Sequence, residues 1–89
     1  MLKISESSTQ GQATLQLAGR LAGEWVSELK AAYGSARAGY GRVILDCSDV
    51  IFVDRAGAAL IRSMAREGVS VTNCSPFIKE QLNQSFAEE

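Results

Sequence analysis

The chain has 89 residues, of which 46% are hydrophobic and 21% are charged, a balance typical of a folded protein rather than a disordered one. At this length the apolar surface organises one core, so we expect a single domain over residues 1–89. Nine basic and ten acidic residues give a net charge of -1, and the scattered basic residues disfavour nucleic-acid binding.

No stretch of the sequence indicates a membrane segment or an export signal. The longest apolar runs, such as residues 43–45 and 51–53, are far shorter than the roughly 20 residues of a membrane-spanning helix. Residues 1–6 lack the apolar stretch of a signal peptide. We therefore expect a cytoplasmic protein that does not insert into a membrane.

Alternating apolar and polar residues at the start of the chain predict two strands with one buried face each. The first alternation covers residues 2–5 and the second covers residues 13–17. Small and polar residues at positions 7–11 lie between them, so a turn is expected there.

An amphipathic helix is predicted next. From Ala22 to about Ala38 the apolar residues recur at steps of three and four. Trp25 lies on the apolar face of this helix and is most simply a core residue. Gly39 is expected to end the helix in the left-handed conformation.

The second half of the chain predicts further strands and helices. Residues 42–45 form a short apolar run rich in β-branched side chains, typical of a central strand buried on both faces. Residues 54–67 carry their apolar side chains on one helical face, and Gly68 follows as a helix stop. Residues 69–72 begin another strand.

A last helix is predicted after Ser75, which suits an N-cap and is followed by Pro76 at the first helical position. This helix is expected to fray over residues 87–89. The predicted order is β-β-α-β-α-β-α, and the strand–helix–strand crossover from Val43 to Val71 should be parallel and right-handed. We expect an α/β fold with a mixed four-stranded sheet and about three helices.

The residues that carry chemistry do not form a catalytic or metal-binding motif. The chain has two cysteines, Cys47 and Cys74, and no histidine, which leaves too few ligands for a zinc site. Both thiols are expected to be buried and reduced. Caps and turns account for Asp46, Asp49 and Asp54 better than a metal does. We expect no metal, no cofactor and no enzymatic activity.

A series of short motifs spans residues 43–60. An apolar strand leads into Asp-Cys-Ser at residues 46–48, an apolar patch follows, and Asp-Arg-Ala-Gly at residues 54–57 opens a helix. Residues 17–21 read Leu-Ala-Gly-Arg-Leu. Together these motifs resemble the signature of STAS domains, the domain of anti-sigma-factor antagonists. The resemblance covers nearly the whole chain and implies a STAS-like fold that works by docking a protein partner.

The resemblance also bears on regulation. In the antagonist branch of the family, an anti-sigma kinase phosphorylates the Ser or Thr immediately before the glycine, and the added charge switches partners. Ala56 occupies that position, and alanine has no hydroxyl group. The resemblance therefore implies either constitutive binding or regulation elsewhere.

We expect the partner to dock at the start of the helix over residues 54–67 and on its exposed side. The candidate binding residues are Asp54, Arg55, Ala56, Gly57, Ala58 and Arg62. Asp54 is also a good N-cap, and capping alone accounts for it more readily. Arg55 lies near the positive end of the helix dipole, which suggests a carboxylate or phosphate on a partner as much as a pairing with Asp54 or a side chain that extends into water. Glycine is unfavourable inside a helix, so Gly57 indicates that this position needs a small residue, either for packing on the sheet or for a partner's approach.

The resemblance leaves several roles open. A regulatory module would bind an anti-sigma factor or a kinase-like protein in the bacterial control of transcription. The first alternative is an adaptor subunit of a lipid or anion transport system, because STAS domains also serve in these. The second alternative is a self-associating module, which would be a stable homodimer. An enzyme is the least favoured class.

Overall fold

The computed structural model describes residues 1–87 and the side chains of residues 1–83. Residues 1–87 form four strands and three helices, which are β1 (Leu2–Thr9), β2 (Gln12–Leu21), α1 (Trp25–Gly39), β3 (Arg42–Val53), α2 (Arg55–Arg66), β4 (Ser70–Thr72) and α3 (Pro76–Ala87). The order β-β-α-β-α-β-α confirms the predicted α/β fold.

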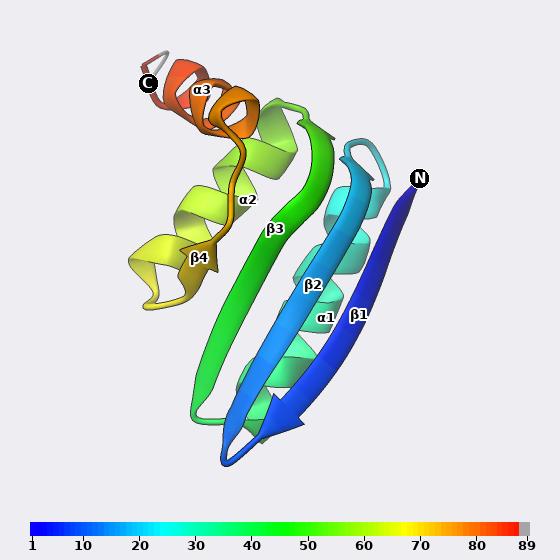
Figure 1. The fold of residues 1–89 in the computed structure, drawn as a ribbon, viewed down its shortest axis with the longest axis vertical. Coiled ribbons are helices and arrows are strands. Elements are labelled where there is room, and N and C mark those ends of the chain that lie inside the picture. The colour runs from blue at the N-terminus through cyan, green and yellow to red at the C-terminus, as the bar shows by residue number, and fades with distance from the viewer. Residues whose placement is uncertain (88–89) are drawn as a thin grey trace.

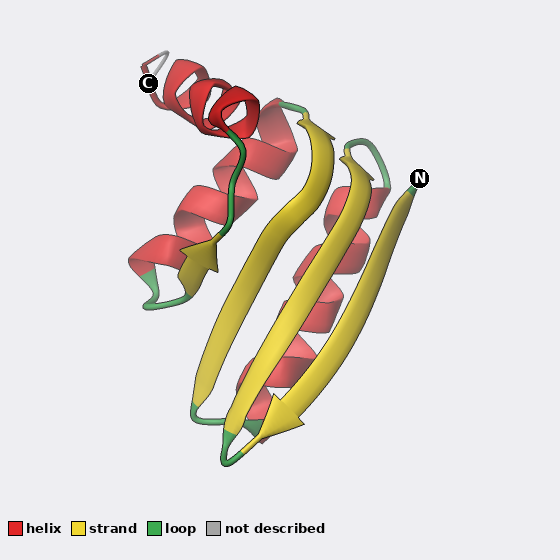
Figure 2. Ribbon diagram, in the orientation of Figure 1, coloured by secondary structure: helices red, strands yellow, loops and turns green. Residues whose placement is uncertain are grey.

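The sheet has the strand order β1-β2-β3-β4. β1 and β2 are antiparallel, whereas β2 and β3, and β3 and β4, are parallel. The parallel β3–β4 pair was predicted, and β2–β3 is likewise joined through a helix. Figure 1 shows α1 and α2 packed behind the sheet, while α3 lies beyond the end of β3. In Figure 2 the opposite face of the sheet carries no helix from the described part of the chain.

The core lies between the sheet and the two helices behind it. Alternate residues of the central strands point inward, and α1 and α2 each contribute a buried stripe at helical spacing. The inward residues are Ala13, Leu15 and Leu17 of β2, Val43, Leu45 and Cys47 of β3, Leu29, Tyr33 and Ala36 of α1, and Ala58, Ile61 and Met64 of α2. Trp25 is partly buried against this core.

The β1–β2 turn is shorter than predicted. The strands extend to Thr9 and from Gln12, so two residues connect them. Gln10 and Gly11 have φ values of 51° and 78°. Two left-handed residues in a two-residue loop match the right-handed twist of the paired strands, which explains why the strands continue to the turn.

The limits of α1 differ from the prediction at both ends. β2 continues to Leu21, and Gly23, with φ 60°, turns the chain so that the helix begins at Trp25 rather than Ala22. Gly39 belongs to the helix and is not left-handed; the chain leaves through Tyr40, which is extended at φ -136°. The Tyr40 N–H donates to the Ala36 carbonyl at 3.0 Å. This bond satisfies a terminal carbonyl without a left-handed residue.

β3 is much longer than the predicted strand over residues 42–45. It continues through the Asp-x-Ser segment to Val53, because β2 pairs with it along almost its whole length. Two register shifts in this pairing absorb the extra residues of β3. Ile44 is half-buried, so one face of β3 is fully buried and the other only partly so.

α3 begins as predicted. The Ser75 hydroxyl accepts a hydrogen bond from the Ile78 N–H at 3.2 Å, and Pro76 is the first helical residue. The helix includes residue 87, while residues 88–89 of the predicted frayed end lie outside the described residues.

Candidate functional site

Asp54 connects the end of β3 to the start of α2 and holds the neighbouring turn. Its Oδ1 atom accepts a hydrogen bond from the Gly57 N–H at 2.7 Å, which confirms the predicted N-cap. Its Oδ2 atom accepts one from the Gly23 N–H at 2.9 Å. The Asp54 N–H donates to the Leu21 carbonyl at 3.1 Å. Both carboxylate oxygens are therefore used within the chain.

Gly57 packs directly against the end of β2. A β-carbon at this position would lie 2.7 Å from the Leu21 carbonyl oxygen and 2.9 Å from Leu21 Cγ. Such distances are too short for any side chain without a shift of the backbone. Packing on the sheet, one of the two explanations that the sequence left open, therefore accounts for the glycine.

Among the predicted site residues, Arg55 and Ala56 are exposed. Gly57 and Ala58 are buried, and Ala58 retains 1% of its surface. Ala58 lies on the inward face of α2 with Ile61, three positions later, because residues at this spacing share one side of a helix. Ala58 and Gly57 thus support the helix start from within, and the surface that a partner can reach is formed by their neighbours.

Arg62 lies further along α2 and is half-buried. It lines a groove of about 260 Å³ between α2 and α3, together with Ala65, Arg66, Leu82 and Asn83. Arg55, Arg62 and Arg66 are spaced seven and four positions apart, so they share one side of α2. The sequence prediction named Arg62 but did not include Arg66.

Apolar and cationic side chains also gather where β3 ends. Ile51 is 62% exposed. The Arg20 guanidinium lies over the Phe52 ring at 4.5 Å from its centroid, a cation–π contact. The Val53 N–H donates to the Gln81 Oε1 atom of α3 at 3.1 Å, which fixes the last residue of the strand. The segment that leads into Asp54 is thus held in place from α3 while Ile51 faces outward.

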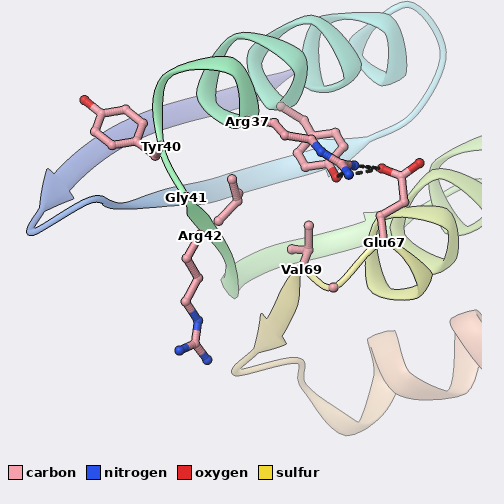
Figure 3. A pocket seen from close by; sticks show the side chains of 9 residues that line it. Arg37, Tyr40, Gly41, Arg42, Glu67 and Val69 are labelled. Carbon is pink, nitrogen blue, oxygen red and sulfur yellow. Dashed lines mark hydrogen bonds and ion pairs between the residues drawn. The ribbon is translucent and has the colours of Figure 1, made fainter.

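A second cavity, of about 130 Å³, was not predicted from the sequence. It lies where α1 and α2 end and β3 begins, and its polar side is formed by Tyr33, Arg37 and Glu67 (Figure 3). The Tyr33 hydroxyl donates to Glu67 Oε1 at 2.7 Å and accepts from Arg37 Nη1 at 2.8 Å. Arg37 and Glu67 also form an ion pair. Arg42, on the rim, points away from this cluster (Figure 3).

The interactions in this cluster change the proton affinity of its members. The hydrogen bond from Tyr33 lowers the pKa of the Glu67 carboxyl group below its ordinary value, and the charge of Arg37 acts in the same direction. Burial and the hydrogen bond to Glu67 raise the pKa of Tyr33. Tyr33 and Arg37 are one turn apart on α1, a spacing visible in the sequence, but their pairing with Glu67 requires the tertiary fold.

The three acidic residues considered as ligands occupy separate places. Asp46 Oδ1 accepts hydrogen bonds from the Ser48 N–H at 3.0 Å and from Asn73 Nδ2 at 3.2 Å. The Ser48 bond, supported by Asn73, holds the pKa of Asp46 below its ordinary value. Within residues 1–87 no three cysteine or carboxylate side chains come together as metal ligands. No helix in the same range is long and apolar enough to cross a membrane.

Residues 4–85 match the family model described as "Mlab, STAS domain". The chain belongs to the STAS domain family. This match covers both motif regions noted in the sequence, residues 17–21 and 43–60, and confirms the resemblance. STAS domains are non-catalytic interaction domains in general. No curated protein matches the chain.

Two solved structures support the STAS fold. The anti-sigma factor antagonist SpoIIAA in its unphosphorylated form is similar with a TM-score of 0.71 and 19% identity, over 93% of this chain and 82% of that one. An uncharacterized protein of the DUF3478 family from Shewanella loihica PV-4, with a SpoIIAA-like fold, has a TM-score of 0.58 and 14% identity, over 85% of this chain and 69% of that one. At these identities the likeness concerns the fold.

Proposed function

We propose that this STAS domain is a non-catalytic regulatory module that docks a protein partner at the start of α2, through Arg55 and Ala56. The main support for this proposal is that adjacent residues at the start of α2 differ in how they are held and exposed. Asp54 and Gly57 are fixed by hydrogen bonding and close packing, while Arg55 and Ala56 between them are exposed. A binding group on a fixed backbone loses little conformational entropy when a partner binds.

The charge of α2 supports a partner with an acidic surface. Residues 55–66 include three arginines, Arg55, Arg62 and Arg66, and no carboxylate. The adjacent Asp54 carboxylate is turned inward to the backbone of Gly23 and Gly57. Because complementary charge steers association and fixes orientation, we expect Asp or Glu side chains on the partner opposite this side of the helix.

Ala56 supports docking that phosphorylation at this position does not control. Its side chain has no oxygen to accept a phosphoryl group. A constitutive contact of this kind suits an adaptor subunit of a membrane transport system as well as an antagonist-like regulator, so the adaptor role is our second candidate. The identity of the captured partner distinguishes the two.

The test compares three baits in pull-downs from the native host, which are the unmodified chain, Arg55→Glu and Lys30→Glu. Lys30 is an exposed cation on α1, so its reversal is a control for charge alone. Any partner captured is then purified and its dissociation constant measured with each variant. We expect Arg55→Glu to weaken binding at least about tenfold, or 1.4 kcal/mol, and Lys30→Glu to have little effect.

Each outcome assigns a role or removes one. An anti-sigma factor or its kinase as the Arg55-dependent partner supports the antagonist-like role, and a transporter subunit supports the adaptor role. Equal binding by all three baits contradicts docking at the start of α2. If no partner is captured and light scattering gives the mass of a dimer, self-association replaces the proposal.

A further inference from the structure

The two cysteines of the chain meet at the junction of β3, β4 and α3. Cys47 follows Asp46, which pairs with Thr72 in the parallel β3–β4 ladder, and Cys74 comes two residues after Thr72. Cys47 is fully buried in the middle of β3, not at a strand end. Cys74 is half-buried and packs against the core cluster that contains Cys47. The two thiol groups interact with each other.

The backbone on both sides of Cys74 is fixed. Asn73, with φ 61°, turns the chain out of β4. Ser75 then caps α3 through its hydrogen bond with the Ile78 N–H at 3.2 Å. Cys74 is thus held directly before the N-terminus of a helix, where the helix dipole favours a thiolate.

The environments of the two sulfur atoms differ. The interaction with the Cys47 thiol lowers the pKa of Cys74 to about 7, against the effect of partial burial, and the charge of Lys79 lowers it further. The same interaction, with burial, raises the pKa of Cys47. Cys74 is therefore the more acidic and the less buried of the two thiols, and Cys47 is the thiol that stays protonated.

We propose that Cys74 is a modification site for hydroperoxides, and that Cys47 resolves the oxidised Cys74 as an intramolecular disulfide. This inference does not rest on the proposed docking function. The pair suits this role because the half-buried Cys74 is partly open to a small oxidant, while Cys47 is fully buried and shielded from solvent. The disulfide would join the middle of β3 to the segment that precedes α3.

The chemistry proceeds in two steps. The Cys74 thiolate attacks one peroxide oxygen, the O–O bond breaks, and the other oxygen leaves as an alkoxide or hydroxide that takes a proton from water. Cys74 is then a sulfenic acid. The Cys47 sulfur attacks the Cys74 sulfur, the S–O bond breaks, and the hydroxide leaves as water with the proton from Cys47. Two electrons pass from the thiols to the peroxide.

The test treats the reduced chain with hydrogen peroxide, labels the remaining thiols with iodoacetamide, and measures the intact mass. We expect both thiols to be protected, with a mass loss of about two hydrogens that dithiothreitol reverses. Cys47→Ala should react more slowly, because it lacks the interaction that lowers the pKa of Cys74, and should accumulate a Cys74 sulfenic acid that dimedone traps. Cys74→Ser should leave Cys47 unoxidised under the same conditions.

Alkylation of the untreated chain provides a second readout that requires no variant. We expect iodoacetamide to label Cys74 before Cys47, with a rate that rises through a midpoint near pH 7. Two freely labelled thiols after peroxide treatment, or a disulfide between two chains, overturn the proposal. Circular dichroism establishes that each variant is folded before its result is used.

Discussion

Asp54 and Gly23 lie 31 positions apart, yet Asp54 Oδ2 accepts a hydrogen bond from the Gly23 N–H at 2.9 Å. The other carboxylate oxygen caps α2 at Gly57. One side chain therefore fixes the turn before α1 and the start of α2 at the same time. The exposed Arg55 and Ala56 are held in place by this pair of hydrogen bonds.

We expect Asp54→Ala to lower the free energy of unfolding by about 1–3 kcal/mol, because it removes a helix cap and leaves two backbone donors without their acceptor. Urea denaturation measures this loss. Asp49→Ala, which removes an exposed carboxylate of β3, is the matched control and should change stability by less than about 0.5 kcal/mol. Equal stability of the two variants would contradict the bridging role. Because Asp54→Ala weakens the fold, Arg55→Glu is the better probe of docking.

Gly57→Ala should destabilise the chain although alanine favours helices. The new methyl group would lie 2.7 Å from the Leu21 carbonyl oxygen, and relief of such a contact requires α2 to move from the sheet, at a cost of about 1–3 kcal/mol. Gly34→Ala in α1 is the control, because nothing lies within 4 Å of its added β-carbon. It should be neutral or more stable by up to about 1 kcal/mol. Thermal denaturation measures the stability of both variants. A Gly57→Ala variant more stable than Gly34→Ala would contradict the close packing of Gly57 on Leu21.

Gln81→Ala should lower stability because it removes the acceptor of the Val53 N–H, a hydrogen bond of 3.1 Å in a partly buried place. An unsatisfied buried donor costs about 1–3 kcal/mol. Glu80→Ala, on the exposed side of the same helix, should change the unfolding midpoint in urea little. If the two variants unfold together, α3 does not hold the end of β3 through this contact.

Tyr33→Phe should remove part of the acid dependence of stability. The folded-state pKa of Glu67 is lowered, chiefly by the Tyr33 hydrogen bond, so its stabilisation is present above the ordinary glutamate pKa of about 4.3 and is lost as pH falls through the folded value. The variant should be less stable than the parent near neutral pH, because it lacks the hydrogen bond to Glu67, and this difference should shrink in acid. A difference that is constant with pH would contradict the role of Glu67.

The folded pKa of Tyr33 is raised, mainly by burial. The stability that depends on Tyr33 is therefore lost as pH rises, whereas the stability that depends on Glu67 is lost as pH falls. The stability from neutral Tyr33 is fully present below the ordinary tyrosine pKa of about 10 and is lost as pH rises through the folded value. The parent chain should therefore lose stability in alkali more steeply than Tyr33→Phe does. Unfolding curves taken on both sides of neutrality test the two signs together.

Much of the fold followed from local patterns, and the errors have physical causes. The Asp54 and Ser75 caps and the Gly68 stop depend on residues close in sequence, and all three were predicted. The extent of β3 was not predicted, because the largely polar segment 46–49 is typical of a loop. Its pairing with β2, which is a tertiary contact, makes it part of the strand. Gly39 was predicted to be left-handed, but it is not. Gly68, with φ 99°, does have a positive φ value.

The candidate site was predicted as a segment but not as a surface. Arg55 and Ala56 are exposed whereas the next two residues, Gly57 and Ala58, are buried, so Ala58 faces the core while Ala56 faces outward. Helical spacing placed the apolar side chains of residues 54–67 on one face, but it did not show which of the small residues at positions 56–59 are buried. The thiols were expected to be buried and reduced, and their proximity, across 27 positions of sequence, follows from the β3–β4 register.

The sequence by itself determined the order of elements, the STAS motifs, the absence of a hydroxyl at Ala56 and the capping by Asp54, because each depends on residues within a few positions of one another. Tertiary structure alone decided that Gly57 packs on Leu21, that Tyr33 and Arg37 meet Glu67, and that Cys47 meets Cys74. These contacts join segments about thirty residues apart, and their formation depends on how strands pair and helices pack, which no local pattern specifies.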